Sequence, residues 1–588
     1  MTVVLQSDVA ATTAHSSVLC LRDLAVTFPG GVRALRGVSL DVAPGEIVGL
    51  VGESGSGKTV LGLAALGLVA PTATLSGTAR LGDTDMVAAG AEQRRLARRR
   101  LAGAVFQDPM TSLNPTMTVG RQVAEAAGSM DAAVELLERA RVPEPRRRAR
   151  QYPHQLSGGL RQRVMIAMAI AGGPALVVAD EPTTALDVTV QAEILRLLSD
   201  LRAETATSIL FVTHDLAVAA TIADRIVVLY GGRLAEVGPT EAVLGNPDHP
   251  YTAALLASRL QPDSVRGRPL ATLPGEPPDP RAHPPGCPFA PRCGLAEGAC
   301  DAEVPEPTAA PRHSGLVACR RAGDGGTAGR GWLHTDDAFP GAAPAGRSPA
   351  LRLCGLSKSF GSRRGRRLVV DDLFLQVPEG GAVALVGESG CGKTTTLRMA
   401  VGLDKPDAGT VELGSGGRPQ LVFQDAGASL TPWLTVGELL DERLRAEGVV
   451  ARRRPARIAD ALGLVGLPPE TARRKPGALS GGQRQRASIA RAVVVPPAFL
   501  ACDEPISALD VSLAATVLNL LGRLRAELGM ALLFVTHDLA AARFVADRVA
   551  VMLDGAIVEE GPADDVLSAP VHEHTRALVA AIPTLASN

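Results

Sequence analysis

The chain carries the same ordered series of short motifs twice. LSGGLRQR recurs as LSGGQRQR, VVADEP recurs as LACDEP, and LFVTHDLA stands unchanged in both halves. The intervals are also kept, because Ser157 and Glu181 lie 24 residues apart, as do Ser480 and Glu504. Equal long intervals do not arise by chance, so the 588 residues predict two copies of one domain, each large enough for its own core.

Each copy contains a glycine loop of the form G-x-x-x-x-G-K-[ST] after an apolar run that is typical of a buried strand. The loops are GESGSGKT at residues 52–59 and GESGCGKT at residues 387–394. In such a loop backbone N–H groups surround a phosphate chain, the lysine reaches its terminal phosphates, and the threonine binds Mg²⁺. The nucleotide-binding residues expected here are Gly52, Glu53, Ser54, Gly55, Ser56, Gly57, Lys58, Thr59 and Val60, and Gly387, Glu388, Ser389, Gly390, Cys391, Gly392, Lys393, Thr394 and Thr395.

The segments between the motifs predict the fold class. Apolar runs such as ALVVAD, SILFVTHD and RIVVLY are typical of buried strands, and they alternate with helical segments. This alternation favours an α/β fold around a mainly parallel sheet. Residues 261–322 are rich in proline and contain four cysteines, whereas residues 323–349 are typical of a flexible linker. The repeated domains are therefore predicted at residues 18–260 and 350–588.

Composition narrows the class of partner. The 60 basic and 61 acidic residues nearly cancel and aromatic residues are only 3%, so the sequence predicts no nucleic-acid partner. No apolar run is long enough to span a bilayer, and the first residues lack the pattern of a signal peptide. We expect a soluble cytoplasmic chain, in which the eight cysteines argue against a disulfide framework and leave room for a metal site.

Further polar residues follow the buried strands of each copy. Asp180 and Asp503 end apolar strands, where a carboxylate can hold Mg²⁺, and an acidic residue comes directly after each of them. Other readings of these patterns stay open. An acidic pair can cap a helix, a histidine after a strand is often structural, and a phenylalanine often belongs to the core.

Together these motifs resemble the ATP-binding cassette family in both halves. The resemblance implies ATP hydrolysis by two domains, each with a RecA-like core, an antiparallel β subdomain and a helical signature subdomain. It also implies a Mg²⁺ site in each half, surrounded by Thr59, Gln107 and Asp180 in the first and by Thr394, Gln424 and Asp503 in the second. Glu181 and Glu504 would polarise the attacking water, which Gln107 and Gln424 would also contact. His214 and His537 would sense the γ-phosphate, and Phe28 and Phe360 would stack on adenine.

In this family the signature motif completes the site of the opposite domain. By resemblance, the signature of the first copy closes on the phosphates held by Lys393, and that of the second copy on those held by Lys58. We expect two active sites, and we expect Leu160, which replaces a commoner polar residue, to be tolerated. The residues implied in these contacts are Ser157, Gly158, Gly159, Ser480, Gly481 and Gly482, together with Asp187 and Asp510 after the acidic motif.

The end of the first copy points to one branch of the family. NPDHPYTAALLAS and the cysteine-containing segment after it resemble the C-terminal extension of oligopeptide, dipeptide and nickel importer ATPases. The second copy is a weaker match, because His574 stands where the first copy has Tyr251. The resemblance implies an energy-coupling subunit that works with two permeases and an extracytoplasmic binding protein, at the cytoplasmic face of the inner membrane. A soluble tandem ATPase acting on ribosomes or DNA, and the ATPase of a drug exporter, are the alternatives.

Four cysteines of this extension form a candidate metal centre. Cys287, Cys293, Cys300 and Cys319 have the spacing C-x5-C-x6-C-x18-C, which lacks the short knuckles of zinc ribbons. The resemblance implies an iron–sulfur cluster, and four thiolates suit a [4Fe–4S] cluster. Zinc, or no metal, remains open on the spacing alone.

Overall fold

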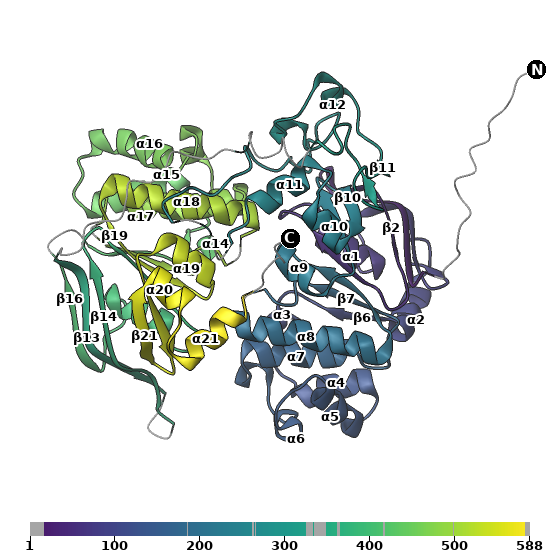
Figure 1. Cartoon of the computed structure of the whole chain (residues 1–588), viewed down its shortest axis with the longest axis horizontal. Coiled ribbons are helices and arrows are strands. Elements are labelled where there is room, and N and C mark those ends of the chain that lie inside the picture. Colours follow the sequence, from purple (N-terminus) through teal and green to yellow (C-terminus); the bar gives the residue numbers. More distant parts are fainter. Residues whose placement is uncertain are drawn as a thin grey trace, which may run out of the picture.

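The two predicted copies form two α/β halves of one molecule. The computed structural model describes residues 17–582 except positions 185, 262, 263, 265, 325–332, 334–347, 362–364, 415–417, 498 and 508. Figure 1 shows the first half in purple to blue, the second in green to yellow, and a teal segment above them. The linker predicted at residues 323–349 falls almost entirely outside the described residues.

The first half contains a small antiparallel sheet and a larger mixed sheet. In the larger sheet the strands from β9 to β6 are parallel to one another, and β10, β12 and β11 continue it in antiparallel fashion. The small sheet has the order β2 (Val32–Val42), β1 (Leu19–Phe28), β4 (Thr74–Leu81) and β5 (Thr84–Asp85). The larger one has the order β11 (Thr308–Ala309), β12 (Leu316–Val317), β10 (Arg233–Pro239), β9 (Arg225–Tyr230), β3 (Ile47–Val51), β8 (Ser208–Val212), β7 (Leu176–Asp180) and β6 (Ala102–Val105).

The second half repeats this plan. Its larger sheet is parallel except for the last pair, β20 and β21. The small sheet has the order β14 (Arg367–Pro378), β13 (Pro349–Phe360) and β16 (Ala408–Leu413). The larger one has the order β17 (Gln420–Val422), β18 (Phe499–Asp503), β19 (Ala531–Thr536), β15 (Ala382–Val386), β20 (Arg548–Leu553) and β21 (Ala556–Pro562). The predicted mainly parallel α/β core is confirmed, although both larger sheets are mixed.

Helices cover these sheets and form a helical layer in each half (Figure 1). In the first half they are α1 (Lys58–Ala65), α2 (Ala91–Leu101), α3 (Pro109–Ser112), α4 (Val119–Ala127), α5 (Met130–Arg139), α6 (Pro145–Arg148), α7 (Gly158–Ala169), α8 (Val188–Thr205), α9 (Leu216–Ile222), α10 (Thr240–Gly245) and α11 (Pro250–Ala257), with α12 (Gly298–Ala302) in the segment that follows. In the second half they are α13 (Lys393–Ala400), α14 (Ala426–Ser429), α15 (Val436–Ala446), α16 (Arg454–Leu464), α17 (Gly481–Val493), α18 (Val511–Leu528), α19 (Leu539–Val545), α20 (Ala563–Ser568) and α21 (Glu573–Ala580).

The central strands position the site. β3, β7 and β8 are apolar along their length and fully buried, as expected for parallel strands covered on both faces. They are neighbours in the order β3, β8, β7, so their carboxyl ends lie at one edge of the sheet. The glycine loop follows β3, Asp180 ends β7, and His214 follows β8. The sheet thus gathers residues that are far apart in the sequence.

The teal segment joins the halves. Leu270 belongs to the hydrophobic core of the second half, although it follows the helices of the first. Its backbone N–H donates to Asn519 Oδ1 (2.9 Å), and Asn519 Nδ2 donates to its carbonyl oxygen (2.8 Å). Nearby, Arg266 donates to the carbonyl oxygen of Ala546 (2.9 Å). These contacts fasten the end of the first copy onto the second.

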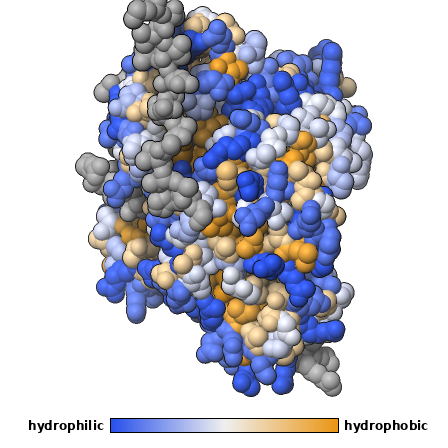
Figure 2. Space-filling model, turned by 90° about the vertical axis from the view of Figure 1, so that its right-hand side faces the viewer, coloured by the Kyte–Doolittle hydropathy of each residue, from blue (hydrophilic) through white to orange (hydrophobic). Residues whose placement is uncertain are grey.

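Among the described residues, none of the helices combines the length and the apolar character that crossing a bilayer requires. The face on the right of Figure 1 is shown turned toward the viewer in Figure 2, where apolar side chains form clusters separated by hydrophilic ones. Such a mixture is ordinary for a protein surface, since apolar atoms always contribute much of it.

Candidate functional site

Both glycine loops have the backbone needed to wrap a phosphate chain. Gly57 and Gly392 precede α1 and α13 with φ of 104° and 112°, a region that favours glycine. A Cβ atom at Gly57 would lie 2.6 Å from the carbonyl oxygen of Ala34. The helix lysines fold back onto their loops, where Lys58 Nζ donates to the carbonyl oxygens of Gly52 (2.7 Å) and Glu53 (3.0 Å). These contacts hold the ammonium group where it can meet phosphate.

The predicted Mg²⁺ ligands lie together in both halves. Thr59 Oγ1 donates to Asp180 Oδ1 at 3.2 Å, and Thr394 Oγ1 donates to Asp503 Oδ1 at the same distance. Burial raises the pKa of Asp180 and lowers that of Lys58. The site therefore disfavours both charges on its own, and a bound metal–nucleotide complex supplies the opposite charges that stabilise them.

Glu181 is held at the centre of the first site. Its φ of 47° lies in the left-handed region, where a non-glycine residue is strained, and such strain gathers at functional sites. Gln107 Nε2 donates to its Oε2 (2.9 Å), and His214 Nδ1 lies 3.3 Å from Oε1. Burial opposes ionisation, but the hydrogen bond and charge of His214, with help from Thr184 and Lys58, lower the pKa of Glu181 to about 2. The carboxylate is therefore ionised, and it can orient a water by accepting a hydrogen bond from it.

The second copy has the same arrangement. Glu504 has φ of 44°, accepts a hydrogen bond from Gln424 Nε2 (3.1 Å), and lies 3.3 Å from His537 Nδ1. Burial again opposes ionisation, yet His537 lowers the pKa of Glu504. The pKa of His537 is raised, because the nearby carboxylate outweighs the effect of burial. Two sites with the same local geometry follow from the repeat.

Each phosphate loop also meets an acidic residue of the opposite half. Asp510, which caps α18, accepts a hydrogen bond from Ser54 N in the first loop (3.2 Å). Asp187, which caps α8, lines a cavity together with Ser389 and Lys393 of the second loop. The two halves therefore face each other across both predicted nucleotide sites.

The signature serines begin helices, as expected for an anion clamp. Ser157 Oγ caps α7 by accepting from Leu160 N (3.4 Å), and Ser480 Oγ caps α17 by accepting from Gln483 N (3.2 Å). Gly159 packs tightly, since a Cβ there would lie 2.6 Å from Val190 Cγ1. Among the described residues, no hydrogen bond or ion pair joins either signature serine to the opposite phosphate loop.

The two predicted adenine-stacking residues differ in exposure. Phe28 ends β1 and packs against the core beside the small sheet. Phe360 ends β13, is 46% exposed, and has Lys358 Nζ 5.7 Å from its ring centroid. Stacking on adenine stays a prediction for both.

Sequence reasoning missed the residues that hold Glu53. This carboxylate forms a buried two-pronged ion pair with Arg292, with Oε2 to Nη1 at 2.6 Å and Oε1 to Nη2 at 3.1 Å. The backbone N–H of Glu53 donates to Tyr251 Oη (2.9 Å), and Arg292 also donates to Tyr230 Oη (3.1 Å). The side chain of Glu53 thus faces the protein, and its backbone N–H is held by Tyr251. A comparison of the two copies could have pointed to these residues, because Leu553 stands where the first copy has Tyr230.

The structure brings the four predicted cysteine ligands around one cavity. The lining residues include Cys287, Cys293, Cys300 and Cys319. All are free thiols, and Cys287 N donates to the carbonyl oxygen of Cys300 (2.7 Å). Burial raises the pKa of Cys287, that of Cys293 to about 11 and that of Cys319 to about 12. These thiols are neutral on their own, so the binding of a metal would have to release their protons.

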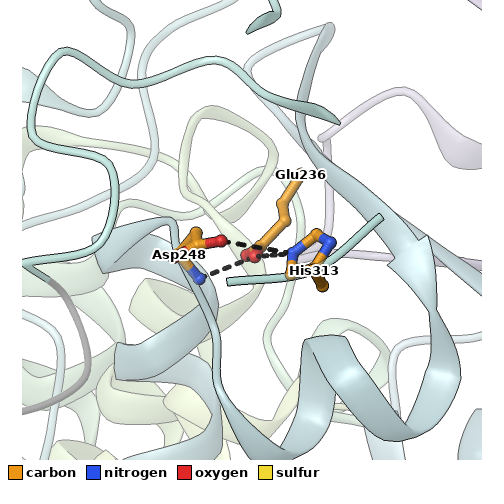
Figure 3. A group of neighbouring side chains, drawn as sticks. All are labelled: Glu236, Asp248 and His313. Atoms are coloured by element: carbon orange, nitrogen blue, oxygen red, sulfur yellow. Dashed lines mark hydrogen bonds and ion pairs between the residues drawn. The ribbon is translucent and has the colours of Figure 1, made fainter. Parts of the chain in front are cut away.

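Another buried polar cluster was not predicted. Figure 3 shows Glu236, Asp248 and His313 converging, with His313 Nε2 at 3.0 Å from Glu236 Oε1 and 3.6 Å from Asp248 Oδ2. Glu236 also accepts from the backbone N–H of Asp248 (2.7 Å). In the second half Glu559 accepts from Val571 N (2.9 Å) in the same way, without the histidine or aspartate. The shared role of this glutamate is therefore to tie its strand to the following loop.

Comparison with known proteins gives a consistent result. The family model described as ABC transporter matches residues 35–184 and 370–507, and that of the oligopeptide/dipeptide transporter C-terminal region matches residues 235–300 and 558–588. The oligopeptide transport ATP-binding protein OppD of Mycobacterium bovis is 42% identical and covers 97% of this chain and 98% of its own length; that of Mycobacterium tuberculosis matches equally. The glutathione import ATP-binding protein GsiA of Salmonella choleraesuis is 38% identical, over 94% of this chain and 87% of its own.

Proposed function

Because this chain belongs to the ATP-binding proteins of ABC transporters and has the oligopeptide/dipeptide C-terminal region in both copies, we propose that it is the ATPase subunit of an importer for oligopeptides or dipeptides. The observation that carries the proposal is the 42% identity to an oligopeptide transport ATP-binding protein over nearly the full length of both chains. We assign residues 18–260 and 350–588 to the two cassettes, 261–322 to the extension and 323–349 to the linker.

The local geometry supports hydrolysis of ATP. The glycine loop and Lys58 would bind the phosphates, and Thr59 and Asp180 would hold Mg²⁺, which would supply charge neutralisation for phosphoryl transfer. Glu181 orients the attacking water, and Gln107 and His214 fix this carboxylate in place. The second copy performs the same steps with its matching residues.

We propose that each site is completed by the opposite half. The contacts of Asp510 with the first loop and of Asp187 with the second support this arrangement, since both reach across the interface. On closure, Ser480 would meet the phosphates at Lys58, and Ser157 those at Lys393. ATP would then join the halves and its hydrolysis would release them, which moves attached subunits.

The partners proposed for this ATPase are two permeases and an extracytoplasmic substrate-binding protein. The chain would sit at the cytoplasmic face of the membrane, held there by the permeases. The test is reconstitution in proteoliposomes with the permeases and the binding protein that its neighbouring genes encode. We expect ATP hydrolysis and uptake that depend on added dipeptides or longer peptides, with glutathione as a comparison because of the 38% identical relatives. The proposal would be contradicted if no peptide stimulated ATP hydrolysis, or if the protein copurified with ribosomes in place of permeases.

We propose that the four cysteines of the extension hold a [4Fe–4S] cluster. Cys287, Cys293, Cys300 and Cys319 line one cavity, and four thiolates suit such a cluster. The cluster would order the segment by joining its ends. Zinc bound by the four thiolates is the alternative.

Metal analysis after anaerobic purification tests this assignment. We expect about four iron atoms and matching sulfide per chain, with a broad visible absorbance. A Cys300→Ser variant should lose most of this iron, whereas Cys354→Ser, outside the cavity, should keep it. Stoichiometric zinc without iron would overturn the cluster.

A further inference from the structure

The extension connects the phosphate loop of the first copy to the signature helix of the second. Arg292, next to Cys293, forms the buried ion pair with Glu53 of the loop. Its Nε donates to the carbonyl oxygen of Pro274 (2.8 Å). Two residues further, Glu276 accepts from Gln483 Nε2, with 2.9 Å to each carboxylate oxygen. A continuous series of contacts therefore runs from one half of the molecule to the other.

Glu276 has a second partner on the same helix. Arg486 Nη2 donates to Glu276 Oε1 at 3.1 Å, and Arg486 is largely shielded from solvent. Gln483 is the third residue of α17 and shares a reciprocal capping arrangement with Ser480, since Ser480 N donates to Gln483 Oε1 (3.1 Å). Glu276 thus binds the side chain of Gln483, which also accepts a hydrogen bond from the backbone N–H of the signature residue Ser480.

Gly275 lies between the two contacts. Its φ of +67° is in the region that favours glycine, and a Cβ there would make ordinary van der Waals contact with Arg292 Cγ at 3.6 Å. Pro274, which precedes it, is the residue that Arg292 holds.

In the part of the chain that the structure describes, no comparable series of contacts joins the second phosphate loop to the first signature helix. Glu388 occupies the position of Glu53, and its carboxylate has no ion pair among the described residues. Leu160 replaces Gln483 in the first signature, and Arg163, at the position of Arg486, pairs with Glu193 of its own half (2.6 Å). The two ATP sites therefore differ although their catalytic residues match.

We propose that Arg292 and Glu276 are positioning residues of one ATP site, the site that Lys58 and Ser480 form across the interface. This inference rests on the proposed closure of each site by the opposite signature. The extension sets the distance between the phosphate loop of Lys58 and the signature helix of Ser480. The first site is therefore positioned for ATP before the halves close, whereas the second site forms only when the halves close.

The test measures ATP binding at each copy separately. In full-length protein with Glu181→Gln and Glu504→Gln to prevent hydrolysis, azido-ATP is crosslinked over a concentration series, and labelled peptides are assigned to each copy by mass spectrometry. Glu276→Gln should raise the half-saturating concentration at the first copy about three- to fivefold, the range expected for a partly exposed ion pair. The second copy should not change. Adding Arg486→Gln should have little further effect, because both changes break one contact.

Two controls make the result specific. Glu306→Gln, an exposed change elsewhere in the extension, should leave both copies unaffected. Ser480→Ala tests the underlying arrangement, and it should weaken labelling at the first copy only.

The possible results distinguish the positioning role of Glu276 from the composite arrangement of the ATP site. If Ser480→Ala acts on the first copy and Glu276→Gln acts on neither, or on both equally, the positioning role is wrong and the composite site stands. If Ser480→Ala has no effect on the first copy, the composite site itself fails. Melting temperatures of all variants show whether any loss reflects unfolding.

Discussion

The ion pair between Arg292 and Glu53 gives the sharpest stability prediction. The two side chains are only 4% and 2% exposed, and removal of the guanidinium leaves a buried carboxylate without its partner. Breaking such a pair costs about 3–5 kcal/mol. Arg292→Met also removes donors to Pro274 and Tyr230, so the upper part of that range is expected. At about 4–5 kcal/mol and roughly 2–4 °C per kcal/mol for a domain of this size, the melting temperature of the first half should fall by about 8–20 °C.

Calorimetry of the full-length protein measures this change. Arg22 provides a matched control, because its pair with Asp41 is also two-pronged, at 2.8 Å for both contacts, but both side chains are exposed. Arg22→Met should cost less than about 1 kcal/mol. The double variant Glu53→Gln with Arg292→Met removes the orphaned charge and should recover more than half of the loss. If Arg292→Met cost no more than Arg22→Met, or if the double variant recovered nothing, the reasoning would be refuted.

Three further predictions concern catalysis, pH and the interface. Glu181→Gln with Glu504→Gln should lower ATP turnover at least about a hundredfold while ATP still binds, and near-normal turnover in a phosphate-release assay would remove both from catalysis. The pKa of His214 is raised above its ordinary 6.5 by Glu181 despite burial, so its ion pair stabilises the fold below pH 6.5 and this stabilisation is lost as pH rises through the raised pKa. Urea titrations of His214→Gln should therefore show a stability deficit that shrinks from about pH 6 to pH 8, and a constant deficit would contradict this. Asn519→Ala leaves the backbone N–H and carbonyl of Leu270 unpaired, so it should cost about 2–4 kcal/mol and expose the segment to protease, and unchanged cleavage would argue against this docking contact.

The residues of each catalytic centre could be predicted because short motifs fix them. A glycine loop after an apolar strand determines where Lys58 and Lys393 lie, and an apolar strand that ends in aspartate places Asp180 at the same sheet edge. The stretch between the loop and Gln107 has the polar, arginine-rich composition of a surface segment, and α2 there buries only Ala97. Local pattern was sufficient in these cases.

Other contacts could not be predicted, because they depend on how distant segments pack. Nothing near Arg292 in the sequence shows that it pairs with Glu53, since the contact requires the extension to fold back onto the first loop. Likewise, the insertion of Leu270 into the second core depends on the relative position of the two halves. Proline-rich segments lack the periodicity from which burial is inferred.

Several residues that differ between the two copies lie at the contacts of the cysteine-containing extension. Tyr230, which accepts from Arg292, and Tyr251, which accepts from Glu53 N, occur in the copy that the cysteine-containing extension follows. Leu553 and His574 stand at their positions in the other copy. Gln483, the partner of Glu276, occurs in the signature that would complete the site of that same first copy. The contacts of the extension with Glu53 and with Gln483 therefore meet at one composite site, while the Mg²⁺ ligands, the carboxylates and the histidines stay the same in both. Because both ends of this series of contacts reach the same site, the extension is expected to act on one ATP site in particular.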